Sequence, residues 1–132
     1  MGFIMSKILV VDDDKEFTTL YEEYLKMVGF DAISENQSSK VMELVYSARP
    51  DAIVLDLMMP EPNGFQLCRM LRADPNFRRT PIIIVTALTD IDSKMVAMGA
   101  GANDYLTKPF HIDELKSRIN TLLERVKQVD DQ

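Results

Sequence analysis

Side chains that could handle a phosphoryl group follow four separate apolar segments of this chain. They are Asp12 and Asp13, Asp56, Thr86, and Lys108. Carboxylates brought close together repel one another unless a cation or a proton lies between them. Oxygen ligands of this kind suit a hard divalent ion, and two or three carboxylates without a cage of carbonyl groups favour Mg²⁺ over Ca²⁺. If the fold collects these groups, we expect an acidic site that binds Mg²⁺.

The same residues could carry out phosphoryl transfer. Bound Mg²⁺ leaves a coordination position for a phosphoryl oxygen. Thr86 and Lys108 would supply a hydrogen-bond donor and a positive charge to the other oxygens, where charge must be stabilised. Asp56 could be the covalent acceptor, as an aspartyl phosphate. Each residue taken alone also fits a structural role, and Asp14 is assigned to one, as a helix N-cap. The functional interpretation depends on the others meeting at one edge of the fold.

Strand-like and helix-like segments alternate along the chain and would position these residues. Short apolar runs predict strands at 7–11, 30–33, 52–55, 82–85 and 104–107. Apolar spacings of three and four predict helices at about 15–28, 38–49, 65–73, 92–98 and 112–129. We expect Gly29 to end the first helix, Ser38 or Ser39 to cap the second and Pro50 to end it. This alternation predicts a doubly wound α/β sheet, in which ligands bind at the carboxyl ends of the strands.

The overall composition sets limits on the class of protein. The length of 132 residues fits a single domain, 1–132, with a core at about 7–127 and short tails at both ends. A net charge of -6 argues against direct binding of nucleic acid, which needs clustered Lys and Arg. We find no apolar run of about 18 residues, so we expect no membrane contact. The apolar start, 1–7, is too short for a signal peptide, and the single cysteine cannot form an internal disulfide. We therefore expect a cytoplasmic location.

Four stretches of the sequence resemble the receiver domains of bacterial response regulators. They are 8–13, 56–60 with Gly64, 84–87 and 104–110, and the resemblance extends over about 7–127. It implies a flavodoxin-like five-stranded parallel sheet in the order 2-1-3-4-5, with five helices. It also implies that Asp56 receives its phosphoryl group from a histidine kinase or a histidine phosphotransfer protein. Every residue that such receivers require is present, which argues against a receiver that is never phosphorylated.

The resemblance also assigns the metal ligands. Asp13 would bind Mg²⁺ directly, Asp12 would act largely through water, and the backbone carbonyl of Met58 would join Asp56 as a further ligand.

An alternative function is a phosphatase with an aspartyl-phosphate intermediate. Phosphatases that resemble the haloacid dehalogenase family need a second acid two residues after the nucleophile. Met58 stands at that position, so the phosphatase interpretation lacks its general acid.

A switch is the remaining implication of the resemblance. Thr86 would move to hydrogen-bond the phosphoryl group, Lys108 would pair with that group, and Tyr105 would turn inward as Thr86 moves. The Lys108–Pro109 peptide bond would be cis. From the position of Tyr105 and the Gly- and Ala-rich segment 97–102, we predict that the signal passes to a downstream protein target or output domain through the fourth helix, fifth strand and fifth helix. The chain would then catalyse only its own phosphorylation and dephosphorylation. A receiver cut from a larger regulator or from a hybrid kinase remains an open alternative.

Overall fold

The computed structural model describes residues 5–130, without the side chains of 129 and 130. Strands and helices alternate throughout this range, as the sequence predicts. The elements are β1 (Lys7–Val11), α1 (Lys15–Met27), β2 (Asp31–Glu35), the 3-10 turn η1 (Ser38–Lys40), α2 (Val41–Ala48), β3 (Ala52–Leu55), α3 (Gly64–Ala73), β4 (Ile82–Thr86), α4 (Ile91–Gly99), β5 (Asp104–Thr107) and α5 (Ile112–Asp130). The expectation about a signal peptide concerns residues 1–7, most of which lie outside the described residues. Within them, no helix is both long and apolar enough to cross a bilayer.

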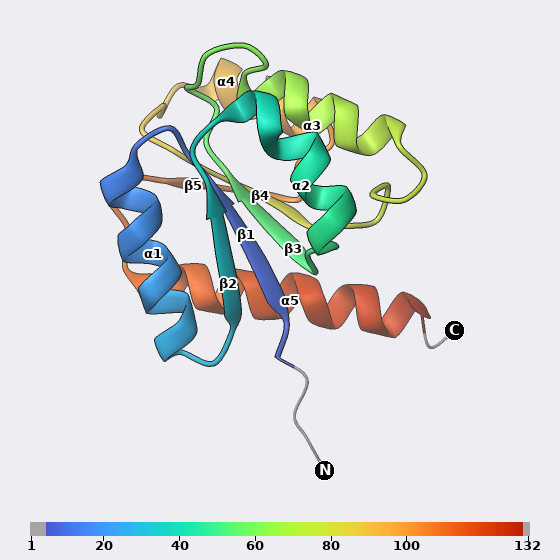
Figure 1. Ribbon diagram of the computed structural model, residues 1–132. Helices are drawn as coiled ribbons and strands as arrows, with labels where there is room; N and C mark the ends of the chain where they lie inside the picture. The colour runs from blue at the N-terminus through green and yellow to red at the C-terminus, as the bar shows by residue number, and fades with distance from the viewer. Residues whose placement is uncertain (1–4, 131–132) are drawn as a thin grey trace.

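The five strands form one parallel sheet in the order β2-β1-β3-β4-β5. Helices α1 and α5 cover one face of the sheet, and α2, α3 and α4 cover the other (Figure 1). This arrangement confirms the predicted doubly wound fold and its strand order. The backbone N–H of Asp56 donates to the Val11 carbonyl at 3.0 Å, and that of Lys108 donates to the Thr86 carbonyl at 2.8 Å. The carboxyl ends of β1 and β3, and those of β4 and β5, are thus tied together at one edge.

Two apolar clusters fill the space between the sheet and its helix layers. Alternate strand residues point to opposite faces. One cluster joins Leu9, Ile53 and Ile84 to α2 and α3 and includes the buried Cys68. The other joins Val10 and further strand residues to α1 and α5. Because β1, β3 and β4 are buried on both faces, their sequences are continuous apolar runs rather than alternating ones.

Helix ends follow the predicted caps in α1 but not in α2. The Asp14 carboxylate accepts hydrogen bonds from the backbone at the start of α1, and Gly29 adopts a φ of 102° just beyond its end. The prediction that Ser38 or Ser39 caps α2 is wrong, because neither α2 nor η1 has a side-chain cap. The Ser38 hydroxyl instead donates to the Pro60 carbonyl at 2.8 Å, which ties the start of this segment to the loop after β3.

Gly64, the first residue of α3, lies directly against the carboxyl end of β3. A Cβ atom added there would lie 2.6 Å from Leu57 Cα and even nearer to the carbonyl oxygen of Asp56. Both obstructing groups are backbone atoms, so a rotamer change of a side chain cannot make room. The absence of a side chain at Gly64 therefore lets α3 start beside the loop that carries Asp56.

We predict that Gly64→Ala lowers the free energy of unfolding by roughly 2 kcal/mol, because the backbone around Asp56 must shift. Gly99→Ala is the matched control, since an added Cβ there meets nothing within 4 Å and alanine favours the helical conformation. Urea denaturation of both variants measures the difference. Equal stability of the two alanine variants would contradict the assigned close approach.

Candidate functional site

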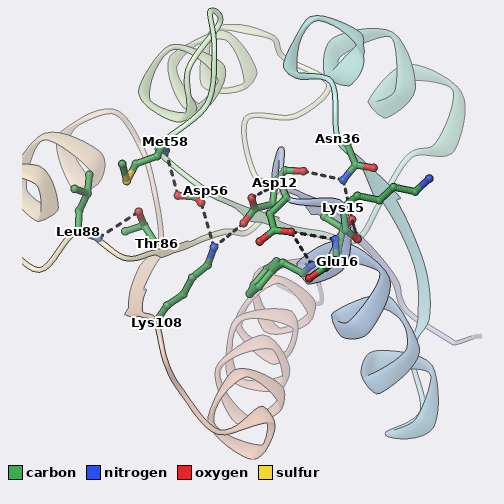
Figure 2. A network of polar contacts seen from close by, with 12 residues as sticks. Asp12, Lys15, Glu16, Asn36, Asp56, Met58, Thr86, Leu88 and Lys108 are labelled. Carbon is green, nitrogen blue, oxygen red and sulfur yellow. Dashed lines mark hydrogen bonds and ion pairs between the residues drawn. The ribbon is translucent and has the colours of Figure 1, made fainter.

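The carboxyl edge of the sheet brings together an ammonium and two carboxylates. Lys108 Nζ, after β5, donates to Asp12 Oδ2 at 2.6 Å and to Asp56 Oδ2 at 3.2 Å. Asp12 follows β1 and Asp56 follows β3, so three strand ends supply the three groups. Figure 2 shows the Lys108 side chain extending to its ammonium between the two carboxylates. We call Asp12, Asp56 and Lys108 the charged triad.

Burial makes the charges of this triad interact strongly. Asp12 is 2% exposed and Asp56 is 6% exposed. Burial raises the pKa of Asp12 to about 6, although the hydrogen bond from Lys108 acts in the opposite direction. Burial lowers the pKa of Lys108, but the hydrogen bond to Asp12 and the charge of Asp56 outweigh it, so that pKa lies above its ordinary value. When all three groups are ionised, the triad holds one negative charge in excess, which favours a further cation.

Backbone N–H groups hold the two carboxylates in place, and a side-chain amide holds the backbone of Asp12. The backbone N–H of Asp14 donates to Asp12 Oδ1 at 2.9 Å, and that of Met58 donates to Asp56 Oδ1 at 3.1 Å. The side-chain amide of Asn36 donates to the Asp12 carbonyl at 2.9 Å (Figure 2). Sequence reasoning missed Asn36, because an Asn after a short strand has the same signal as any loop residue.

Asp13 has a different environment from its neighbour. It is exposed and lines a hollow of about 240 Å³ together with Asn36, Pro60 and Glu61. Over residues 5–130, no three His, Cys, Asp or Glu side chains are grouped closely enough to hold a metal ion. The assignment of Asp12, Asp13 and Asp56 as metal ligands therefore stays a prediction. Two buried carboxylates with excess negative charge are nevertheless hard oxygen ligands that fit Mg²⁺.

The expected switch residues are linked through the backbone of Leu88. Thr86 is fully buried, and its Oγ1 accepts a long hydrogen bond of 3.5 Å from the Leu88 N–H. The Tyr105 hydroxyl donates to the Leu88 carbonyl at 2.8 Å, and Tyr105 is only 8% exposed. Tyr105 is therefore largely buried, and its expected inward turn as Thr86 moves stays a prediction. The Lys108–Pro109 bond is cis, as the resemblance implies, and Glu61–Pro62 is cis as well.

Comparison with known proteins identifies what the chain is similar to. The family model described as "Response regulator receiver domain" matches residues 8–120. Among curated proteins, the DNA-binding dual master transcriptional regulator RpaA of Synechocystis is 38% identical over 125 residues, which are 95% of this chain and 52% of that protein. Response regulator MprA of Mycobacterium ulcerans is 38% identical over 96% of this chain and 53% of its own length. The chain thus spans about half the length of these relatives.

Solved structures agree with the sequence matches. The receiver domain of the Francisella response regulator 1452 has a TM-score of 0.84 and 37% identity, over 91% of this chain and 98% of that one. The BeF3-activated N-terminal receiver domain of Klebsiella pneumoniae RstA has a TM-score of 0.84 and 31% identity, over 89% of this chain and 98% of that one. The likeness therefore extends over almost the whole of these isolated receiver domains.

We predict that two variants of the charged triad differ in stability when divalent ions are absent. Lys108→Met leaves two buried carboxylates unpaired and should lower the free energy of unfolding by roughly 3 kcal/mol. Asp56→Asn leaves a balanced Asp12–Lys108 pair and should leave stability unchanged or raise it. Urea denaturation at neutral pH with EDTA gives both values. A loss of stability in Asp56→Asn as large as that in Lys108→Met would refute the charge argument.

Proposed function

The chain belongs to the response regulator receiver domain family, and from this premise we propose that it is a phosphorylation-dependent switch whose acceptor is Asp56. The observation that carries the proposal is the charged triad, in which Lys108 holds Asp56 beside Asp12 at the carboxyl edge of the sheet. The donor would be a histidine kinase or a histidine phosphotransfer protein. As part of the proposal, residues 1–132 form one cytoplasmic receiver domain.

The geometry supports direct roles for Asp56 and Lys108 in the transfer. Oδ1 of Asp56 is held by the Met58 N–H and Oδ2 by Lys108, so the carboxylate is oriented before a donor arrives. An oxygen of Asp56 would attack the phosphorus as the bond from phosphorus to the donor's histidine nitrogen breaks. Lys108 would then pair with an oxygen of the transferred group, and the Thr86 hydroxyl would donate to another.

The residues present fit a divalent ion beside the acceptor. Asp12, Asp13, Asp56 and the backbone carbonyl of Met58 would hold Mg²⁺, which would neutralise charge on the phosphoryl oxygens when bound. The exposed Asp13 carboxylate is free to turn toward the ion, whereas Asp12 is held by Lys108 and by the backbone of Asp14. This contrast supports direct binding by Asp13 and largely water-mediated binding by Asp12.

The output would be a change in protein contacts on the face made by α4, β5 and α5. Leu88 links the buried Thr86 to Tyr105 just before α4 begins. Ile91, Met95 and Met98 are large, exposed apolar side chains on α4 and could contact a downstream protein target or output domain. The protein would catalyse only its own phosphorylation and dephosphorylation. The phosphatase alternative is disfavoured because Met58, two residues after Asp56, cannot act as an acid.

We expect acetyl phosphate with Mg²⁺ to add one phosphoryl group to the wild-type protein and none to Asp56→Asn. Intact mass spectrometry measures the addition, and thermal melts show that the variant is folded. The matched control is Asp51→Asn, since Asp51 is an exposed carboxylate that accepts a hydrogen bond from the Lys7 N–H at the other end of β1. Modification of Asp56→Asn to the wild-type extent, or none in the wild type, rules out the acceptor assignment.

We also expect Mg²⁺ to raise the melting temperature, because an ion at ~100 times its dissociation constant stabilises a folded protein by about 2.7 kcal/mol. Asp13→Asn should reduce this increase. Asp14→Asn is the adjacent control and should retain it, because asparagine caps a helix as well as aspartate does. If Mg²⁺ leaves the melting temperature of the wild type unchanged, the metal assignment fails.

A further inference from the structure

An aromatic ring contacts the charged triad on a third side. The ring centroid of Phe17 lies 3.9 Å from Lys108 Nζ. Attraction between an ammonium and a ring face is appreciable when the nitrogen lies within about 6 Å of the centroid. An ammonium has three N–H donors, and the carboxylates of Asp12 and Asp56 accept two of them. The face of Phe17 is thus placed to interact with the remaining part of the charge.

Contacts from two segments hold the ring of Phe17. Phe17 lies in the first turn of α1, where its backbone N–H donates to the Asp14 carboxylate at 3.3 Å. Its ring centroid lies 4.2 Å from that of Tyr21, which in turn lies 5.1 Å from the ring of Phe110. Phe17 and Phe110 both pack against the core cluster shared with α1 and α5. The aromatic cluster therefore ties the start of α1 to the segment that follows Lys108.

A lysine side chain needs such a support more than most catalytic groups do. Its ammonium is a compact charge at the end of a flexible four-carbon stem, which can adopt many rotamers. Lys108 starts at the end of β5 and reaches past β4 to the ends of β3 and β1. When Asp56 accepts a phosphoryl group, the contact of Lys108 with Asp56 must be replaced by one with the new oxygens. The contact with Phe17 involves neither Asp56 nor its substituent and can persist throughout.

We propose that Phe17 is a positioning residue for phosphoryl transfer, and that its ring face holds the Lys108 ammonium in place beside Asp12 and Asp56. This inference rests on the proposed function. It requires a π face at position 17 and not apolar volume alone. Leucine would exclude water from the same space without attracting the ammonium, whereas tyrosine would preserve the attraction.

The contact itself can be tested without any phosphorylation. A ring face above the ammonium shifts the resonances of the neighbouring Hε protons of Lys108 upfield. We expect this shift in the NMR spectrum of the wild type and of Phe17→Tyr, and its loss in Phe17→Leu. Tyr24→Leu is the matched control. Tyr24 belongs to the same aromatic cluster, with its ring edge-on to that of Tyr21 at 5.9 Å between centroids, but the ring over the Lys108 ammonium is that of Phe17. An ordinary Lys108 shift in the wild type overturns the proposal.

The role in transfer is tested with acetyl phosphate, a small donor that needs no protein docking surface, at saturating Mg²⁺. Phe17→Leu should be phosphorylated about fivefold more slowly, the equivalent of about 1 kcal/mol. Phe17→Tyr and Tyr24→Leu should stay within about twofold of the wild type. Thermal melts identify the folded variants, and Phe17→Met replaces Phe17→Leu if the latter does not fold.

The outcomes separate the two proposals. A wild type that is not phosphorylated overturns the proposed function and the role of Phe17 with it, whatever the NMR shift shows. A phosphorylated wild type with an equally fast Phe17→Leu overturns the role of Phe17 alone. A Phe17→Tyr variant as slow as Phe17→Leu also overturns it, because the shape of the side chain would then matter more than its π face.

Discussion

The ammonium of Lys108 holds two buried carboxylates at the edge of the sheet that would otherwise repel each other. Removing Asp12 and Asp56 from water carries a cost, and the opposite charge of Lys108 at close range offsets much of it. The strand order makes this arrangement demanding, since β4 lies between the strand that leads to Lys108 and the strand that leads to Asp56. A long side chain is needed to pass the end of β4, and Thr86 is the residue that it passes. Strand order, burial and the length of lysine therefore depend on one another.

A second feature of the structure is the shallow burial of helix α4. The one buried residue of α4 is Ala97, whereas α3 buries four residues: Gly64, Leu67, Cys68 and Leu71. The segment after α4 is nevertheless firmly held. Arg72 donates to the Gly101 carbonyl at 2.8 Å and to Asn103 Oδ1 at 2.7 Å, and the missing side chain of Gly101 leaves room for it. The start of α4 is instead tied to the site through Leu88. The two ends of α4 are therefore restrained by different parts of the structure, and the helix between them has few contacts with the core. Low burial of this kind suits an element that moves.

Much of the fold could be predicted because its signals are local. Apolar runs in β1, β3 and β4 reflect burial on both faces of each strand, and Asp14 and Gly29 act on the backbone within their own turns. The failure at Ser38 has the opposite cause. Its hydroxyl bonds to Pro60, 22 residues away, so a tertiary partner replaced the local capping role. Sequence periodicity carries no information about a partner at such a distance.

The features of the candidate site also fall into those that the sequence predicts and those that depend on distant partners. The amino-acid sequence by itself determined which chemical groups stand at the strand ends, because a polar residue directly after an apolar run marks the end of a buried strand. It also matched the family motifs that surround Asp56. Only the tertiary structure decided which of these groups meet. It joined Asp12 to Lys108 across 96 positions, left Asp13 exposed, and set the ring of Phe17 over the ammonium. In the sequence, Phe17 is one more apolar residue on the inner face of a helix. Its contact with a charge depends on how α1 and the segment after β5 pack together in space, and helical spacing does not encode that distance.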